Sequence, residues 1–173
     1  MANSLWKRLR RIARHRWWDE RDAARFLPPA ALSRIEARVA SSELGHSGEI
    51  RVCIEAGLPL SYLWRGLSAR DRAITLFGKL RVWDTAQNNG VLIYLLLAEH
   101  AIEIVADRGL AAAVSPADWV QWMAPMREAF RRGEFERGLN DAIDAIDQRL
   151  ASHFALEPGQ ADHNELPNRP VVL

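Results

Sequence analysis

The alternation of apolar and polar positions along the chain predicts one small β-sheet. Strands are predicted at residues 49–55, 91–97 and 101–106. The first strand alternates apolar and polar side chains, whereas the second is apolar throughout, which is typical of a strand covered on both faces. A short turn at Glu99 and His100 separates the second strand from the third, so we expect these two strands to form an antiparallel hairpin.

Apolar residues at helical spacing surround these strands and predict five helices. The helices are expected over residues 4–18, 29–45, 68–80, 116–132 and 135–150. Ser68 and Ser115 occupy the positions that begin two of them, each with an aspartate three residues later. Residues 57–66 are predicted to be a loop in spite of their apolar side chains, and residues 107–109 are predicted to interrupt the regular structure after the third strand.

The order of these elements predicts an α/β fold. A strand, a helix and a second strand imply a parallel pair with a right-handed crossover, and the hairpin adds the third strand. The central β-sheet is therefore expected to be mixed, with helices on both faces. We expect a basic amphipathic helix at residues 1–18, one compact α/β domain at residues 19–154, and a disordered tail at residues 155–173, where proline, glycine and asparagine are frequent.

The composition agrees with this picture. The chain has 173 residues, of which 49% are hydrophobic and 26% charged, and a net charge of +1, which suits a single globular domain. Cys53 is the only cysteine, so no intramolecular disulfide can form, and no spacing of zinc ligands occurs. The longest apolar run, residues 91–98, is too short to cross a bilayer, and the N-terminus lacks the apolar stretch of a secretory signal. We therefore expect a cytoplasmic protein.

The charge is unevenly distributed, because the chain begins with a basic segment. The cations that precede the first acidic residue are Lys7, Arg8, Arg10, Arg11, Arg14 and Arg16. Trp6, Trp17 and Trp18 lie nearby, and a basic helix with aromatic residues can dock on an anionic membrane surface. The alternative is an extra helix packed against the domain with its charges in solvent. We do not expect a nucleic-acid partner, because the rest of the chain is slightly acidic and has no recognition motif.

Four groups of segments resemble, in their order and spacing, the family of TPM domains. They are Ser47–Val52; Leu76, Phe77 and Leu80 with 83–85 and 89–94; Glu103–Gly109; and Trp119, Phe130, Gly133 and Phe135 with 138–139 and 142–143. The resemblance covers most of the chain and implies a compact α/β sandwich. Some members of the family have a secretory signal and a membrane anchor, which this sequence lacks, so it resembles the soluble members. Chloroplast members are associated with photosystem repair, acid phosphatase activity and divalent-ion binding, which the resemblance raises as hypotheses for this chain.

The predicted topology brings three polar segments to one edge of the sheet. Residues 46–49 enter the first strand, residues 84–90 enter the second, and residues 107–109 leave the third at the same end. Oxygen donors suit Ca²⁺ or Mg²⁺, and the candidate ligands at this edge are Asp84, Asn88, Asn89 and Asp107. The accessory candidates are Ser47, Glu49, Thr85 and Arg108, of which the arginine could hold an anionic group. The alternative is that Asp, Asn and Gly occur here because they favour turns.

These features support three hypotheses about function. The first is a non-enzymatic accessory domain that binds a divalent cation or a protein partner at this edge, near the cytoplasmic face of a membrane. The second is a weak metal-dependent acid phosphatase, which would act through a metal-activated water with Asp84 and Asp107, because the sequence contains no nucleophile motif and no phosphate-binding loop. The third is a peripheral membrane module that acts through the basic N-terminal helix.

Overall fold

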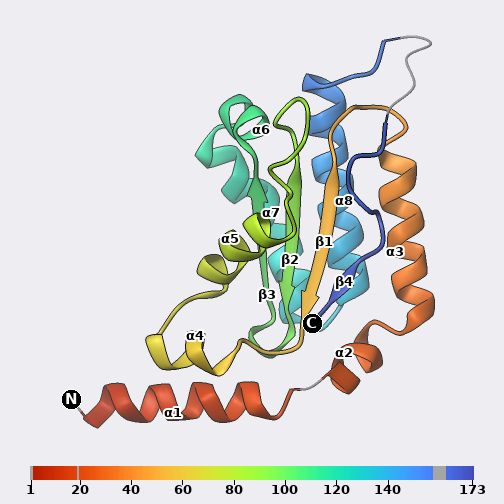
Figure 1. Cartoon of the computed structure of the whole chain (residues 1–173). Helices are drawn as coiled ribbons and strands as arrows, with labels where there is room; N and C mark the ends of the chain where they lie inside the picture. Colours follow the sequence, from red (N-terminus) through yellow and green to blue (C-terminus); the bar gives the residue numbers. More distant parts are fainter. Residues whose placement is uncertain (1, 19, 158–162) are drawn as a thin grey trace.

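A mixed four-stranded sheet forms the centre of the molecule (Figure 1). The computed structural model describes residues 2–18, 20–157 and 163–173. The strands are β1 (Ile50–Glu55), β2 (Val91–Leu96), β3 (Ala101–Ala106) and β4 (Val171–Val172), in the spatial order β3-β2-β1-β4. β1 is parallel to β2 and to β4, whereas β2 and β3 are antiparallel. The predicted parallel pair and the predicted hairpin are therefore both confirmed.

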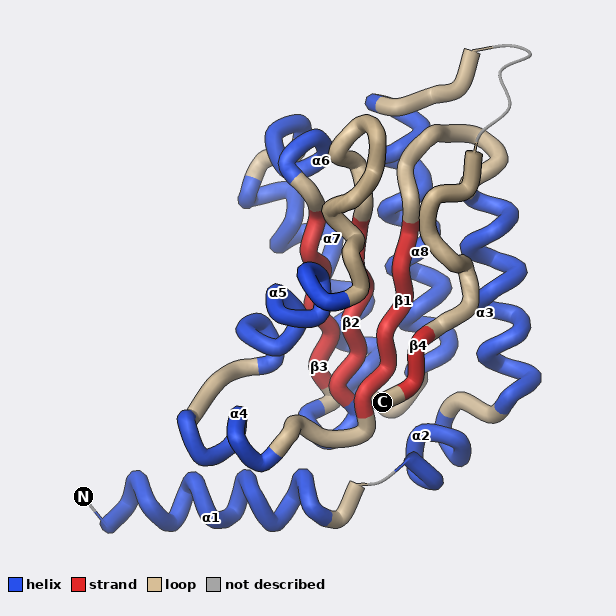
Figure 2. The backbone as a smooth tube through the Cα atoms, viewed as in Figure 1, coloured by secondary structure: helices blue, strands red, loops and turns tan. Residues whose placement is uncertain are grey.

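Helices cover both faces of this sheet (Figure 2). They are α1 (Ala2–Arg16), α2 (Glu20–Phe26), α3 (Pro29–Ser42), α4 (Leu60–Arg65), α5 (Ala69–Lys79), the 3-10 turn η1 (Leu97–Glu99), α6 (Arg108–Ala113), α7 (Pro116–Arg131) and α8 (Phe135–His153). One face packs on α3, α7 and α8, and the other packs on α4 and α5. The period of two along each strand explains this division, because Val52 and Ile54 of β1 join the first core while Cys53 joins the second.

Three short helices are absent from the sequence prediction. The segment that was predicted as a loop contains α4, which ends at Gly66 in the left-handed conformation, and the predicted interruption after β3 becomes α6. The chain also forms α2 before Pro28. α4 and α6 have six residues each and bury one apolar side chain apiece, Leu63 and Leu110. A helix of this length shows no apolar periodicity, so the pattern of the sequence does not reveal it.

The C-terminal segment differs from the predicted disordered tail, because residues 163–173 lie along the outer side of β1. Val171 pairs with Cys53, and the buried carboxylate of Glu49 accepts hydrogen bonds from the backbone N–H groups of Glu165 (2.9 Å) and Leu166 (3.2 Å). Arg51 donates to two further carbonyl groups of this segment. Backbone hydrogen bonds and a single buried leucine order the segment, and neither leaves a periodic signature in the sequence.

Candidate functional site

Three loop segments meet at the amino-terminal end of β1 and β2, which lies at the top of Figure 1. We call residues 46–49, 84–90 and 107–109 the loop edge. The side-chain nitrogen of Asn89 donates to the carbonyl of Ser47 (3.0 Å), and the N–H of Gly109 donates to the carbonyl of Asn88 (2.9 Å). The N–H of Asp107 donates to the carbonyl of Gly90 (2.8 Å). The three segments therefore meet, as the predicted topology requires.

Two glycines allow this close approach. A Cβ atom on Gly90 would lie 1.9 Å from the carbonyl oxygen of Val82, and one on Gly109 would lie 2.6 Å from the carbonyl oxygen of Asn88. Both contacts are with backbone atoms, which cannot rotate away as a side chain can. The loop edge is therefore a tightly packed arrangement whose backbone geometry depends on these two positions.

Arginine side chains engage two of the four candidate cation ligands. Asp84 forms an exposed ion pair with Arg81, three residues earlier in the chain. The amide oxygen of Asn88 accepts two hydrogen bonds from the guanidinium of Arg108, at 3.0 and 2.6 Å. In this arrangement Arg108 binds the amide of Asn88. The carboxylate of Asp84 is paired with the guanidinium of Arg81.

The other two candidate ligands each keep one oxygen without a partner. Asn89 is 1% exposed, and its Oδ1 atom has no hydrogen-bond partner. Asp107 caps α6 with Oδ1, which accepts the N–H of Arg108 at 2.7 Å, while its buried Oδ2 atom has no partner. Buried oxygens without donors are costly, and a cation or a hydrogen-bond donor would satisfy them. However, the described residues contain no group of three or more His, Cys, Asp or Glu side chains that could hold a metal.

The accessory candidates have structural partners. Ser47 donates its hydroxyl to Gln87 (3.0 Å), and the hydroxyl of Thr85 accepts the N–H of Asn89 (3.1 Å). Glu49 is buried beneath the C-terminal segment that it holds. The structure also adds Glu165, whose carboxylate accepts the N–H of Ala86 at 2.9 Å. It lies in the segment predicted to be disordered, so no sequence pattern indicated it.

The basic helix α1 lies at the opposite end of the sheet, where its side chains bond with the carboxylate of Glu99 and with backbone groups of Leu58 and Leu67. Glu99 accepts hydrogen bonds from Arg11 (2.7 Å) and from Nε2 of His15 (2.9 Å). The Nδ1 atom of the same histidine accepts the N–H of Leu58 (3.0 Å), so the ring proton lies on Nε2. Burial opposes the charge of Glu99, but the hydrogen bonds from His15 and Arg11 outweigh it and lower the pKa of Glu99 to about 2.

This attachment fills the position where many α/β sheets bind their ligands. That position is the carboxyl end of the parallel strands, here β1 and β2. Residues 56–58 follow β1, and a Cβ atom on Gly57 would lie 2.8 Å from the carbonyl oxygen of His15. α1 therefore covers the usual ligand position.

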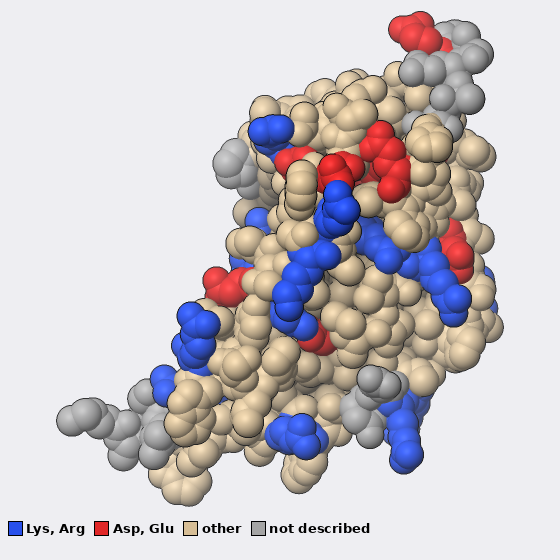
Figure 3. All heavy atoms as spheres, viewed as in Figure 1, with Lys and Arg blue, Asp and Glu red and all other residues tan. Residues whose placement is uncertain are grey.

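The side of α1 that faces away from the domain is both aromatic and basic. Trp6 is 72% exposed and Trp17 is 86% exposed, and Leu9 lies between them in the sequence with 46% exposure. The exposed cations of this helix are Lys7, Arg8, Arg10, Arg14 and Arg16. Arg8 lies seven residues before His15 and therefore on the same side as that histidine, so we call the other seven residues the α1 face. In the view of Figure 3, Lys and Arg side chains form separate patches at the lower end of the molecule and a band across its middle, and several Asp and Glu side chains gather near the upper end.

The neighbouring helix α4 also exposes apolar side chains. α4 packs beside α1 and exposes Leu60 and Trp64, which is 64% exposed. An aromatic and apolar surface bordered by cations is the composition of a helix that lies in a lipid headgroup region. Within the described ranges, no helix has the length and apolar character needed to traverse a bilayer.

Comparisons with known proteins agree with this architecture. The family model described as the TPM domain matches residues 21–149. The NMR structure of the BA42 protein from the psychrophilic bacterium Bizionia argentinensis is 30% identical, covers 85% of this chain and 95% of that chain, and has a TM-score of 0.74. The N-terminal domain of a protein from P. gingivalis is 19% identical over 75% of this chain and 81% of that chain, with a TM-score of 0.57, and shows the fold alone. None of the curated proteins matches the chain.

Proposed function

The chain belongs to the TPM domain family, and we propose that it is a binding domain that docks on an anionic lipid surface through the α1 face. The observation that carries this proposal is the exposure of Trp6 on a basic helix and of Trp17 directly after it, while the opposite side of the helix is fixed to the domain. α1 precedes the residues that the family model matches. Lipid docking is therefore proposed for this chain and not for the family.

One side of α1 contacts the domain, and the other side is available to contact lipid. Arg11 and His15 lie on one side and hold the helix to Glu99. Trp6 and Trp17 lie on the other side, and the exposed cations flank them. Each cation near an anionic membrane contributes about 1 kcal/mol, and indole rings partition into the headgroup region. The α1 face can therefore contact lipid while the domain stays folded beneath it.

Sedimentation of the full chain with vesicles tests this proposal. We expect binding to vesicles of phosphatidylcholine mixed with phosphatidylglycerol, and much less binding to phosphatidylcholine alone. The double variant Arg10→Glu/Arg14→Glu replaces two attractive charges by two repulsive ones, so at about 1 kcal/mol per unit of charge its partitioning should fall by about 1,000-fold. Trp6→Ser with Trp17→Ser should also weaken binding, because the apolar contact is lost.

A matched control separates the α1 face from total charge. Arg131 lies on α7 with its side chain 72% exposed, and Arg131→Glu should bind the mixed vesicles as the unchanged protein does. Equal partitioning of the unchanged chain and of both double variants would show that the α1 face does not contact lipid. Salt should weaken the binding, since exposed charges are screened.

A divalent cation at the loop edge is the second candidate function. The observation that favours it is the pair of buried oxygens without partners, Asn89 Oδ1 and Asp107 Oδ2. One carboxylate and one amide provide few ligands, so an ion held there would keep several waters and bind weakly. The phosphatase alternative would use the same carboxylate together with Asp84, which the structure pairs with Arg81.

Thermal melting in Ca²⁺ or Mg²⁺ tests this second candidate. We expect millimolar ion to raise the melting temperature of the full chain, and Asp107→Ala to abolish the rise. Asp118→Ala is the matched control, because Asp118 also interacts with a helix N-cap, at the start of α7. The same ion-induced rise in all three proteins would remove the loop edge as the site. Hydrolysis of a phosphate ester measured in the same titration would test the phosphatase alternative.

A further inference from the structure

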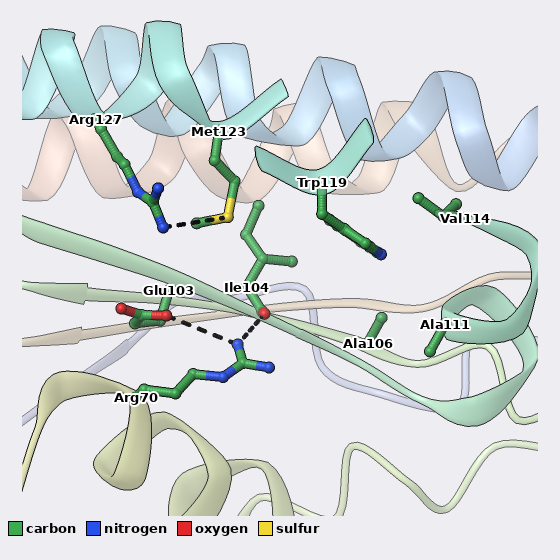
Figure 4. Close-up of a pocket in the computed structure, with 9 residues that line it drawn as sticks. All are labelled: Arg70, Glu103, Ile104, Ala106, Ala111, Val114, Trp119, Met123 and Arg127. Carbon is green, nitrogen blue, oxygen red and sulfur yellow. Dashed lines mark hydrogen bonds and ion pairs between the residues drawn. The ribbon is translucent and has the colours of Figure 1, made fainter. Parts of the chain in front are cut away.

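A separate cavity of about 410 Å³ lies beside the outer edge of β3, between α5, α6 and α7 (Figure 4). β3 is the last strand of the sheet on this side, so no neighbouring strand fills the space. The volume falls within the range of about 300–1,000 Å³ that is usual for small-molecule sites. Neither the loop edge nor the α1 face contributes a residue to its lining.

Two arginines enter this cavity from opposite sides. Figure 4 shows Arg70 extending from α5 and Arg127 extending from α7, both toward the edge of β3. Arg70 donates one hydrogen bond to the carbonyl of Ile104 and lies 3.7 Å from a carboxylate oxygen of Glu103. Arg127 has a 3.9 Å contact with the sulfur of Met123 and forms no ion pair with any residue that the structure describes. Among the described residues, the guanidinium of Arg127 thus lies near an acid, Glu103, without forming an ion pair with it.

The lining of the cavity carries more positive than negative charge, which favours the binding of anions. Among the described lining residues, Glu103 is the only acid, against the two arginines. Burial raises the pKa of Glu103, while Arg70 and Arg127 oppose this rise. Guanidinium groups bind carboxylates and phosphates through paired hydrogen bonds, so an anion could bridge the two arginines.

The remaining wall of the cavity is flat and apolar. Trp119 lies half-buried on α7 above the cavity, in edge-on contact with Trp122 at 5.8 Å between ring centroids. Met123 continues this wall, and Ala106 and Ala111 form the opposite side without bulky groups. An aromatic ring placed here would contact an indole and a thioether, and both are favourable neighbours for a ring.

From this arrangement we infer that the cavity is a binding site for a small anion with a flat apolar body, of the aryl phosphate or aryl carboxylate class. The anionic group would lie between Arg70 and Arg127, and the ring would pack against Trp119. This inference is independent of the proposed lipid docking, which uses other residues at another end of the molecule.

An NMR titration of the full chain with phenylphosphonate tests the inference, because this probe is an aryl anion that is not hydrolysed. We expect chemical shift changes at the amide of Ile104 and at the indole N–H of Trp119. Phenylphosphonate should bind about tenfold or more tightly than benzyl alcohol, which has the ring without the charge. Methylphosphonate, which has the charge without the ring, should also bind more weakly.

Substitutions on α7 provide the decisive comparison. Arg127→Gln should weaken phenylphosphonate binding by about tenfold, whereas Arg131→Gln, on the same helix but exposed and paired with Glu128, should bind as the unchanged protein does. Arg70→Gln provides a second variant if Arg127→Gln alters the folded spectrum. Equal affinity in the variants and the unchanged chain, or equal affinity for phenylphosphonate and benzyl alcohol, would overturn the inference.

Discussion

Replacing Glu99 with glutamine is expected to loosen α1 from the domain. This carboxylate accepts hydrogen bonds from both Arg11 and His15, and it is the acceptor that joins α1 to the end of the hairpin. Glutamine has nearly the same shape but no charge, so the change removes the ion pair with little effect on packing. If α1 is loosened, the orientation of the α1 face relative to the domain should also vary more.

The size of the effect follows from the pKa of Glu99. It falls from an ordinary value of 4.5 to about 2, and each unit corresponds to about 1.4 kcal/mol, which gives an upper limit of about 3 kcal/mol. The side chain remains 20% exposed, and solvent screens part of the interaction. We therefore expect Glu99→Gln to lower the free energy of unfolding by about 1–2 kcal/mol at pH 7.

The lowered pKa of Glu99 also makes its contribution to stability depend on pH. A carboxylate whose pKa is lowered by folding stabilises the protein fully above the unfolded pKa of 4.5, and this contribution is lost as the pH falls toward 2. The stability difference between the unchanged protein and Glu99→Gln should therefore shrink by about half at pH 3. Urea denaturation at pH 7 and pH 3 measures the difference, and hydrogen exchange of the α1 amides shows where it arises.

A control and a contradicting result complete this experiment. Glu136→Gln removes an ion pair with Arg34, whose side chain is 60% exposed. The free energy of unfolding of this variant should therefore differ little from that of the unchanged protein at either pH. A difference between Glu99→Gln and the unchanged protein that stays constant from pH 7 to pH 3, or unaltered exchange in α1, would refute the reasoning.

Three other outcomes follow from buried positions. Arg72→Met should lower the free energy of unfolding, measured by urea denaturation, by about 3–5 kcal/mol, because it leaves the carboxylate of Glu55 buried without its cation. A loss of less than about 1 kcal/mol would contradict this expectation. Gly90→Ala should lower the melting temperature far more than Gly66→Ala. A Cβ atom at position 90 would collide with backbone atoms, whereas residue 66 has a left-handed conformation but open space around its Cβ position. Similar melting temperatures of the two variants would argue against a tightly packed loop edge. Burial raises the pKa of Cys53 to about 12, so its thiol should react with a disulfide reagent at pH 8 only after denaturation, and rapid reaction of the folded protein would show that the strand opens.

The strands and the longer helices could be predicted because their patterns are repeated over many residues. β2 is apolar at every position, and α8 places an apolar side chain on one face at each turn. The same information gives the topology, since a short turn forces a hairpin and a long connection containing a helix allows a parallel pair. From that topology the meeting of three loops at one edge also follows.

The chemistry of the loop edge could not be predicted in the same way. Asp84 and Asn88 are suitable cation ligands by residue type, but Arg81 and Arg108 engage them. The side chain that an arginine binds depends on the rotamers of both residues and on differences of about an ångström in their positions, and packing in the folded protein determines both. Glu165 reaches the loop edge from a distant segment, and a pattern of local positions contains no information about such a contact.

The two-residue strand β4 has a consequence for the behaviour of the protein at high concentration. An unpaired sheet edge can add a strand from another molecule, and this is a common start of aggregation. Here the end of the chain pairs with β1 through Cys53 and Ile54, while Arg70 occupies a carbonyl on the far edge at Ile104. β4 therefore covers part of β1, and Arg70 occupies one carbonyl of the boundary strand β3, so fewer backbone groups are left to pair with a strand from another molecule.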